Sequence, residues 1–300
     1  MAMEQSFAMI GTGVMGRGMA LNLSRGGATV YLYARRLEAV KELQAEGMEA
    51  RTDPLEAVSK ANTVIVCLTT DEVVRSVLFD SGMFSSLKDR AAAGEPICII
   101  DTGTTSPGLT MEMAGLCQDA GIGFLDAPMT GSRNGAESGQ ILFMVGGPDR
   151  LIDEQKFFFE TCGKQVIRCG SVGSGQNVKI VLNMTQASML QSLMEGWIFS
   201  RKLGVTSDVF QQVIRESAAK CGISEFKMGC VYREDFDVHF ALKHMNKDVN
   251  HAIHLAMEHN ASLPLAFALK AVYDAGINQG QGEEDFCSLS KVNERLNGLR

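Results

Sequence analysis

Short apolar runs alternate with helix-like stretches through the first half of the chain. Each apolar run predicts a β-strand, and the runs fall at residues 7–10, 29–33, 63–68, 96–100, 124–125 and 141–145. Between them, apolar residues recur every three or four positions, as at residues 71–78 and 111–120, which is the spacing of a helix that buries one face. This alternation predicts a doubly wound α/β domain, in which helices cover both faces of a parallel sheet.

The second half of the chain carries a different pattern. One helical pattern runs without a strong breaker from residue 178 to residue 202. Further helical patterns follow at residues 209–218, 242–258 and 265–275, and strand-like runs disappear. We therefore predict an α/β domain over residues 1–172 and an all-α domain over residues 173–300 that includes the long helix.

The composition narrows the class of protein. Of the 300 residues, 45% are apolar and 21% are charged, which is typical of a soluble globular protein. The formal net charge of −7 argues against nucleic acid or an anionic membrane as a partner. No apolar run approaches the roughly 20 residues that a membrane helix needs.

The cysteines and the first residues bear on the compartment. The eight cysteines form no C-x-x-C pair and several lie inside apolar runs, so they predict buried, reduced thiols rather than disulfides. The chain does not start with the basic segment and apolar core of a signal peptide. We therefore expect a cytoplasmic protein, with a removed organellar transit peptide as the open alternative.

A glycine-rich turn follows the first predicted strand and opens the first predicted helix. In such a turn the first glycine permits the tight bend, the second lets a pyrophosphate approach the backbone, and the third lets helix and strand pack closely. The strand–turn–helix context favours dinucleotide binding over a purely structural glycine turn. The residues expected to bind the cofactor here are Gly11, Gly13, Val14, Met15 and Gly16.

The end of the second predicted strand indicates which dinucleotide is bound. NAD sites usually carry an acidic residue there for the ribose hydroxyls, whereas this chain has Ala34, Arg35 and Arg36. Guanidinium groups suit a 2′-phosphate in geometry and charge, so the segment favours NADP, with NAD as the alternative. We expect further cofactor contacts from Leu68, Thr69 and Val73.

Three further segments end predicted strands or open predicted helices, at the edge of the sheet where ligands bind in such folds. They are residues 101–107, 126–132 and 173–179. In the second segment, Thr130, Gly131 and Ser132 offer two hydroxyl groups and backbone N–H groups, which suit a carboxylate. The alternative for this triplet is a plain turn.

Lys179 and Asn183 lie four residues apart on the long predicted helix and therefore on one face of it. A lysine near a nicotinamide can donate a proton to an alkoxide that develops there, and the asparagine could orient either partner. From this pair alone, a surface lysine on an amphipathic helix is the more common explanation.

All five histidines lie between residues 239 and 259, which raises the question of a metal site. Their spacing matches no standard zinc pattern, and the motif H-E-x-x-H does not occur. We therefore predict no bound metal.

Together these segments resemble the β-hydroxyacid dehydrogenase family, the 3-hydroxyisobutyrate dehydrogenase-like enzymes, over nearly the whole chain. The family's glycine motif, its Asp-x-Ser-Thr signature and its Asp-Ala-Pro-Val-Ser-Gly-Gly segment are similar to residues 11–16, 101–104 and 126–132. Its catalytic lysine, with an asparagine four residues later, matches Lys179 and Asn183. Its Lys-Asp-Leu near the cofactor resembles the segment that begins at Lys247.

Several positions depart from the family pattern. Gly103 and Thr130 stand where the family usually has serine, and Ser132 replaces a glycine. Ser132 and the segment that begins at Phe240 are similar to the glyoxylate and succinic semialdehyde reductase branch. These differences leave the substrate open between that branch and the 3-hydroxyisobutyrate-type enzymes.

The resemblance implies a Rossmann domain, a long interdomain helix, an α-helical domain and a homodimer or homotetramer. It also implies reversible hydride transfer between a nicotinamide and a small hydroxyacid or semialdehyde. In that reaction Lys179 would protonate the alkoxide, with Asn183 positioning it. The remaining site residues would be Thr130, Gly131 and Ser132 at the substrate carboxylate, Thr104 at nicotinamide or substrate, Lys247 at the cofactor and Phe240 at the pocket wall.

Two other classes of protein are similar in architecture. Imine reductases typically lack the helix lysine, and catalytically silent, cofactor-bound scaffolds share the glycine motif but have lost that lysine. Lys179 therefore favours an enzyme of hydroxyacid chemistry over both alternatives.

Overall fold

The computed structural model describes residues 5–131 and 133–300, and the chain divides into two compact units. The first unit extends to Lys179 and the second begins at Ile180. Each unit has a buried apolar core of its own.

A sheet forms the centre of the first unit. Its strands are β1 (Ser6–Ile10), β2 (Thr29–Tyr33), β3 (Glu49–Arg51), β4 (Thr63–Val66), β5 (Cys98–Asp101), β6 (Gly123–Asp126), β7 (Met129–Thr130), β8 (Ile141–Gly146) and β9 (Gly163–Gly170). The strand order is β3-β2-β1-β4-β5-β6-β8-β7, and β9 pairs with β8. The strands from β3 to β6 are parallel, as the sequence predicts, whereas β8 runs antiparallel to β6 and β7.

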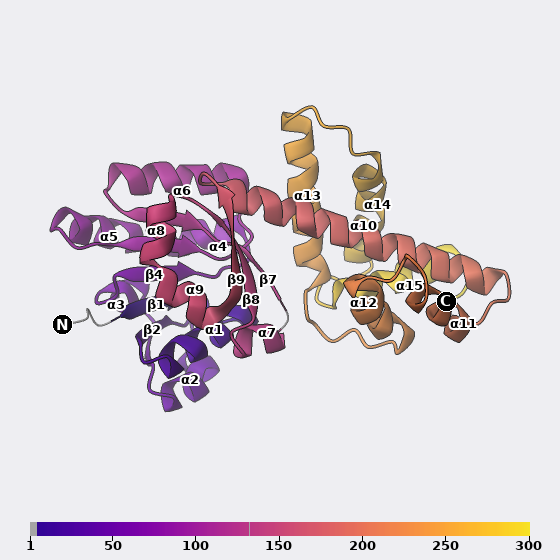
Figure 1. Ribbon diagram of the computed structural model, residues 1–300, viewed down its shortest axis with the longest axis horizontal. Coiled ribbons are helices and arrows are strands. Elements are labelled where there is room, and N and C mark those ends of the chain that lie inside the picture. The colour runs from indigo at the N-terminus through magenta and orange to yellow at the C-terminus, as the bar shows by residue number, and fades with distance from the viewer. Residues whose placement is uncertain (1–4, 132) are drawn as a thin grey trace. The chain divides into compact units, whose positions relative to one another are not determined.

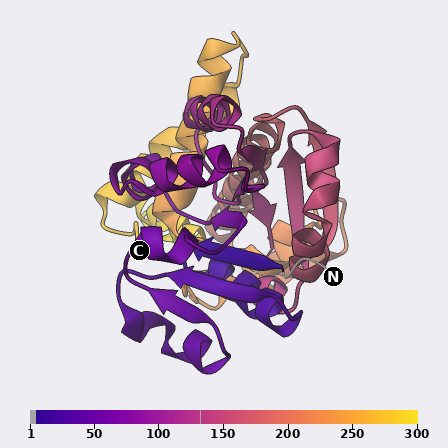
Figure 2. The ribbon, with the colours of Figure 1, turned by 90° about the vertical axis from the view of Figure 1, so that its left-hand side faces the viewer.

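Helices cover both faces of this sheet. They are α1 (Val14–Arg25), α2 (Lys41–Ala45), α3 (Pro54–Val58), α4 (Asp71–Arg75), α5 (Met83–Ala92), α6 (Pro107–Asp119), α7 (Arg133–Glu137), α8 (Asp149–Glu154) and α9 (Lys156–Cys162). A π-helical turn, Ser76–Asp80, follows α4, and a 3-10 turn, Leu37–Val40, precedes α2. Helices α1, α8 and α9 pack on one face, and α3 to α6 pack on the other (Figure 1 and Figure 2).

Successive residues of β1 point to opposite faces, so the strand contributes to both cores. Phe7 and Met9 lie in one core and Ala8 and Ile10 in the other. Because both faces are covered, strands such as β4 are buried at every residue and mostly apolar instead of alternating, and their apolar runs are therefore visible in the sequence.

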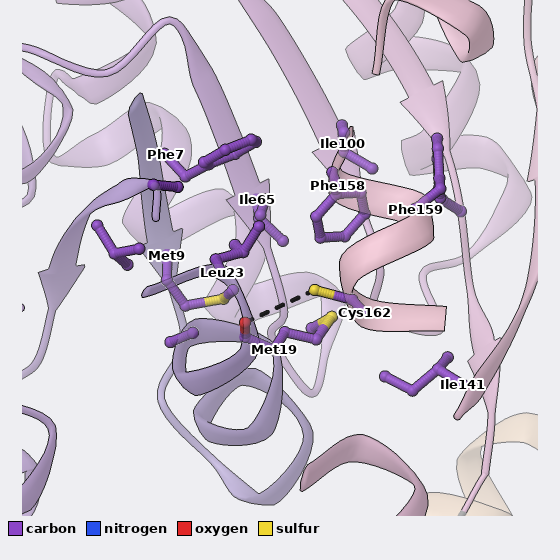
Figure 3. Close-up of a cluster of buried hydrophobic side chains, with 14 of the residues drawn as sticks. Phe7, Met9, Met19, Leu23, Ile65, Ile100, Ile141, Phe158, Phe159 and Cys162 are labelled. Carbon is purple, nitrogen blue, oxygen red and sulfur yellow. Dashed lines mark hydrogen bonds between the residues drawn. The ribbon is translucent and has the colours of Figure 1, made fainter. Parts of the chain in front are cut away.

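Figure 3 shows part of the core that α1 and α9 share. Phe7 and Phe158 lie together there with their ring centroids 6.4 Å apart. Across the same core, the Cys162 thiol donates a hydrogen bond to the Met19 carbonyl oxygen, with sulfur and oxygen 3.6 Å apart (Figure 3). These contacts fix α1, and with it the turn that precedes α1, against the sheet.

The apolar pattern of the sequence did not predict three of the strands, and each omission has a physical reason. β3 and β7 have only three and two residues, which is too short for a periodic pattern. β9 leaves five of its eight residues exposed and therefore lacks a continuous apolar run. Each of them lies toward an end of the strand order, where fewer faces are buried.

The second unit is helical, as predicted. Its helices are the part of α10 (Ser174–Lys202) beyond Lys179, α11 (Ser207–Arg215), α12 (Gly222–Tyr232), α13 (Leu242–Glu258), α14 (Pro264–Asn278) and α15 (Ser290–Leu296), with a 3-10 turn at Phe286–Leu289. Trp197, Met228 and Tyr273 are among its buried core residues. Within the described residues, β-type pairing in this unit is limited to an isolated bridge between Ala241 and Asp285.

Helix α10 confirms the predicted long helix. It begins in the first unit and continues into the second without interruption. None of the helices in the described part of the chain is long and apolar enough to cross a membrane.

Candidate active site

The glycine turn between β1 and α1 has no room for side chains at two of its glycines. A Cβ at Gly11 would lie 2.2 Å from the Cys67 carbonyl oxygen, and one at Gly16 would lie 1.9 Å from the Gly11 carbonyl oxygen. Gly11 also has a φ of +111°, a conformation that side chains disfavour. The turn is therefore held tightly against the carboxyl end of β4.

The second glycine of the turn, Gly13, faces open space. Gly13 is the N-cap of α1, and a Cβ built there meets no atom within 4 Å. Among the described residues, no side chain caps this helix and its first turn carries no acid, so its first N–H groups and positive dipole face outward. Val14 is exposed, whereas Met15 packs against the core. This cradle fits a dinucleotide pyrophosphate.

Arg35 and Arg36 follow β2 directly, after the buried Ala34. Both arginines are exposed, and neither forms an ion pair within the described ranges 5–131 and 133–300. Their guanidinium groups are therefore accessible to an anion at the end of this strand.

The loop after β4 lies against the glycine turn. Leu68 approaches Gly11, because a Cβ on that glycine would be 3.2 Å from the Leu68 side chain. Thr69 and Val73 are exposed, and the Val73 N–H donates to the Thr70 hydroxyl that caps α4, at 3.4 Å. The predicted cofactor residues of this loop thus lie beside the glycine turn or on an exposed surface next to it.

Gly103 explains one departure from the family pattern. A Cβ at this position would lie 2.6 Å from the Leu68 carbonyl oxygen, so a serine does not fit without movement of the backbone. The buried Asp101 accepts a hydrogen bond from the Gly103 N–H at 3.1 Å, and Thr102 donates to the Val66 carbonyl at 3.0 Å. These contacts hold the loop that carries the half-buried Thr104.

Two buried polar residues fasten the start of α10 to the sheet. Asp126, at the end of β6, accepts hydrogen bonds from the Gly173 N–H at 2.7 Å and the Gln176 N–H at 2.8 Å. Burial raises the pKa of Asp126, and these N–H donors partly oppose the shift. Gln176 and its contacts were missed by sequence reasoning, although the segment 173–179 was singled out.

Lys179 lies three residues beyond Gln176 on α10, and only 8% of it is exposed. Lysines are rarely this buried unless their ammonium group is paired or used.

Of the predicted carboxylate-binding triplet, Thr130 ends β7 half-buried and Gly131 is exposed, with a φ of +155°. Ser132 lies outside the described residues.

In the second unit, one carboxylate joins two predicted site residues. The Asn183 amide donates to Asp248 Oδ2 at 2.6 Å, and Lys247 Nζ lies 3.0 Å from Asp248 Oδ1. Both interactions are made to a carboxylate and are therefore charge-assisted, and because Asp248 is fully buried, water weakens them little. Sequence reasoning found the asparagine and the lysine, but gave the aspartate between them no role.

Phe240 is held by a buried ion pair. Its N–H donates to Asp285 Oδ2 at 2.9 Å, and its ring contacts the edge of Phe286, with centroids 6.3 Å apart. Lys227 Nζ lies 2.7 Å from the same carboxylate. Burial alone would raise the pKa of Asp285, but the charge and hydrogen bonds of Lys227, together with backbone N–H donors, lower it.

The described residues contain no group of three or more histidine, cysteine or acidic side chains that could hold a metal ion. All eight cysteines are free thiols.

The glycine turn and the open N-terminus of α1 indicate the general class of the protein, which is a dinucleotide-binding α/β protein. Residues 6–171 match the model of the NAD-binding domain of 6-phosphogluconate dehydrogenase. Residues 173–293 match the model of the NAD-binding domain of NADP-dependent 3-hydroxyisobutyrate dehydrogenase.

Known proteins are similar over the full length. The chain is 30% identical over 301 residues to 2-(hydroxymethyl)glutarate dehydrogenase of Eubacterium barkeri, covering 99% of this chain and 98% of that one. It is 28% identical to glyoxylate/succinic semialdehyde reductase 1 of Arabidopsis thaliana, covering 96% and 97%. A solved 3-hydroxyisobutyrate dehydrogenase of Mycobacterium tuberculosis with L-serine superimposes with a TM-score of 0.85 at 27% identity, covering 97% and 99%.

The chain therefore belongs to the β-hydroxyacid dehydrogenase family, as the sequence motifs predicted. It is an NAD(P)-dependent oxidoreductase that acts on CH–OH groups.

Proposed function

We propose that the protein interconverts a small carboxylate-bearing hydroxyacid and its semialdehyde, with Lys179 as the proton donor and acceptor. The observation that carries this proposal is the burial of Lys179 near the start of α10, three residues after Gln176, whose hydrogen bonds to Asp101 and Asp126 fasten the helix to β5 and β6. A bound nicotinamide supplies or takes up the hydride.

The residues of the chain handle the proton and the substrate. In reduction, negative charge builds on the substrate oxygen, and a fixed ammonium group at Lys179 stabilises that charge and supplies the proton. Asn183 follows one turn later on α10, and its amide is oriented by Asp248. Lys247 is proposed to contact the cofactor, and Phe240 to form a wall of the substrate pocket.

The cofactor is proposed to lie along the edge of the sheet where the glycine turn follows β1. The residues assigned to it are Gly11, Gly13, Val14, Met15, Gly16, Arg35, Arg36, Leu68, Thr69 and Val73, with Thr104 at the nicotinamide end. Support comes from the open Gly13 N-cap and from the two exposed guanidinium groups after β2.

We propose NADP as the preferred cofactor, so the Arg35→Ala variant should raise the KM for NADPH far more than the KM for NADH. A charge-assisted hydrogen bond is worth about 1.5–3 kcal/mol, so the KM for NADPH should rise roughly ten- to a hundredfold. Initial-rate kinetics with both cofactors measure this. Arg150→Ala on α8 is the matched control, because Arg150 is an exposed arginine on another element. Equal kcat/KM for both cofactors in the unmodified enzyme would contradict the preference.

Thr130, Gly131 and Ser132 are proposed to bind the substrate carboxylate. NADPH oxidation should therefore be fast with succinic semialdehyde, glyoxylate, methylmalonate semialdehyde or tartronate semialdehyde, and slow with neutral aldehydes of matching length. Binding energy from the acid group positions the reacting carbonyl, so neutral aldehydes lose kcat/KM.

The Thr130→Val variant tests the anchor directly, because valine keeps the shape of the side chain and removes the hydroxyl. The kcat/KM for the acid should fall roughly tenfold or more, while the value for the neutral aldehyde stays unchanged. If both substrates lose activity equally, or if neutral aldehydes react as well as acids, the carboxylate is bound elsewhere.

Within the family, glyoxylate and succinic semialdehyde are the alternative to the substrates of a 3-hydroxyisobutyrate-type enzyme. Gly103, whose place leaves no room for the serine of the common family pattern, supports a site that differs from that of strict 3-hydroxyisobutyrate enzymes. The substrate panel above separates the two.

We also propose a cytoplasmic homodimer or homotetramer, with residues 173–300 as the substrate and oligomerisation domain. Phe199, Leu203, Val209 and Val213 each expose more than half of their surface, and α11 has no buried residue among those described. Exposed apolar side chains of this kind support burial against another copy of the chain. The free thiols support a reducing compartment.

A further inference from the structure

The side-chain amide of Gln176 is inserted between two segments that carry proposed site residues. Its Nε2 donates to the Gly103 carbonyl at 2.9 Å and to Asp101 Oδ2 at 3.3 Å. Its Oε1 accepts from the Thr105 N–H at 3.2 Å. Gln176 is completely buried, so water does not compete for these bonds.

The amide therefore holds both sides of Thr104. Two of its contacts are with residues 103 and 105, and Thr104 lies between them. On its own helix, the Gln176 backbone N–H is held by Asp126, and Lys179 follows within the same turn. One side chain thus connects the loop of Thr104 to the helical turn that carries Lys179.

We propose that Gln176 is a positioning residue that sets Lys179 relative to Thr104; the inference rests on the proposed function of those two residues. The orientation of the amide matters, because the site needs a donor toward Asp101 and Gly103 and an acceptor toward Thr105. Glutamate has nearly the same shape and keeps the acceptor, but it donates only when protonated.

The Gln176→Glu variant turns this requirement into a pH dependence. At about pH 8.5 the new carboxylate would face Asp101 and the Gly103 carbonyl oxygen, and the loop and helix would separate. Because catalysis depends on sub-ångström placement, kcat should fall roughly ten- to a hundredfold, with a smaller change in the KM for the substrate. Burial and Asp101 raise the pKa of the new carboxyl group, so lowering the pH to about 6 should restore the donor and much of the lost kcat. The unmodified enzyme should show no such gain.

Gln191→Glu is the matched control on the same helix. Gln191 is also buried, and its Nε2 donates to Glu195 and Asn293, at 2.8 Å each. This variant should lose stability in a similar way but keep kcat and its pH profile. If its kcat recovers at low pH as in Gln176→Glu, the effect is general instability and the proposal is wrong.

The double variant Asp101→Asn/Gln176→Glu tests the contact itself. The amide introduced at position 101 would donate to the carboxylate introduced at position 176, so part of the kcat should return at about pH 8.5, where the single variant is weakest. If Gln176→Glu does not fold, Gln176→Met should show a lowered kcat without recovery at low pH. An unchanged kcat in Gln176→Glu, or in Gln176→Met, would overturn the proposal.

Different experimental results would show that this inference fails and that the proposed function fails. If the unmodified protein turns over no hydroxyacid or semialdehyde, the proposed function fails. The thermal midpoint of Gln176→Glu would still rise toward that of the unmodified protein as the pH falls, because the same hydrogen bond returns. A normal Lys179-dependent activity with a pH-independent Gln176→Glu variant would instead reject the positioning role alone.

Discussion

Replacement of Lys179 by alanine is expected to lower kcat by roughly 10²–10⁴-fold, the usual contribution of a positioned acid or base. Hydride delivery to a carbonyl builds negative charge on its oxygen, and removal of the ammonium group leaves no fixed donor from this position. NADPH binding should be little changed, because the proposed phosphate contacts lie at the glycine turn and after β2. Steady-state kinetics and NADPH fluorescence titration measure the two effects.

Two further variants sharpen this prediction. Lys179→Arg keeps the charge but cannot release its proton near neutral pH, so it should not restore kcat in the oxidation direction. Lys164→Ala, at an exposed lysine on β9 of the same unit, should behave like the unmodified enzyme. A Lys179→Ala enzyme with a raised KM and a normal kcat at saturating substrate would remove Lys179 from the chemical step.

Replacement of Lys227 by methionine is expected to lower the free energy of unfolding by about 3–5 kcal/mol, because it leaves the buried Asp285 without its cation. The two side chains are only 6% and 1% exposed, and Lys227 also lies over the Phe286 ring at 4.6 Å. Chemical denaturation at neutral pH measures the loss.

The same pair predicts a dependence on pH. In the unmodified protein the pKa of Asp285 is lowered, so its contribution to stability is present above its unfolded pKa of about 3.9 and is lost as the pH falls through the folded value. In Lys227→Met, protonation of Asp285 removes the unpaired charge. The difference in stability between the two proteins should therefore shrink in acid.

An exposed ion pair provides the control for this prediction. Arg75 and Glu112 form a bidentate contact at the surface, and Arg75→Met should leave the free energy of unfolding nearly unchanged, because water screens exposed charges. If Lys227→Met is no less stable than Arg75→Met, the buried pair adds nothing to the free energy of unfolding.

Lys227→Met is also expected to raise the KM for substrate, because Asp285 also holds the Phe240 backbone.

Local patterns in the sequence predicted a large part of this structure. The strands from β1 to β6 that are buried on both faces appear as apolar runs, and α10 appears as a long pattern without a breaker. The glycine spacing predicted the turn at Gly11–Gly16, since Gly11 and Gly16 leave no room for a Cβ. The spacing of Lys179 and Asn183 placed both on one helix because a helical turn repeats within four residues.

Contacts between residues far apart in the chain required the tertiary structure. Asn183 meets Asp248 across 65 positions and Lys227 meets Asp285 across 58, and no periodicity relates the members of either pair. The antiparallel direction of β8 and the clash that requires glycine at Gly103 likewise depend on neighbouring strands. Secondary structure follows local spacing, which the chain displays directly. The partners of buried polar groups follow from packing, which brings together segments whose separation in the sequence carries no signal.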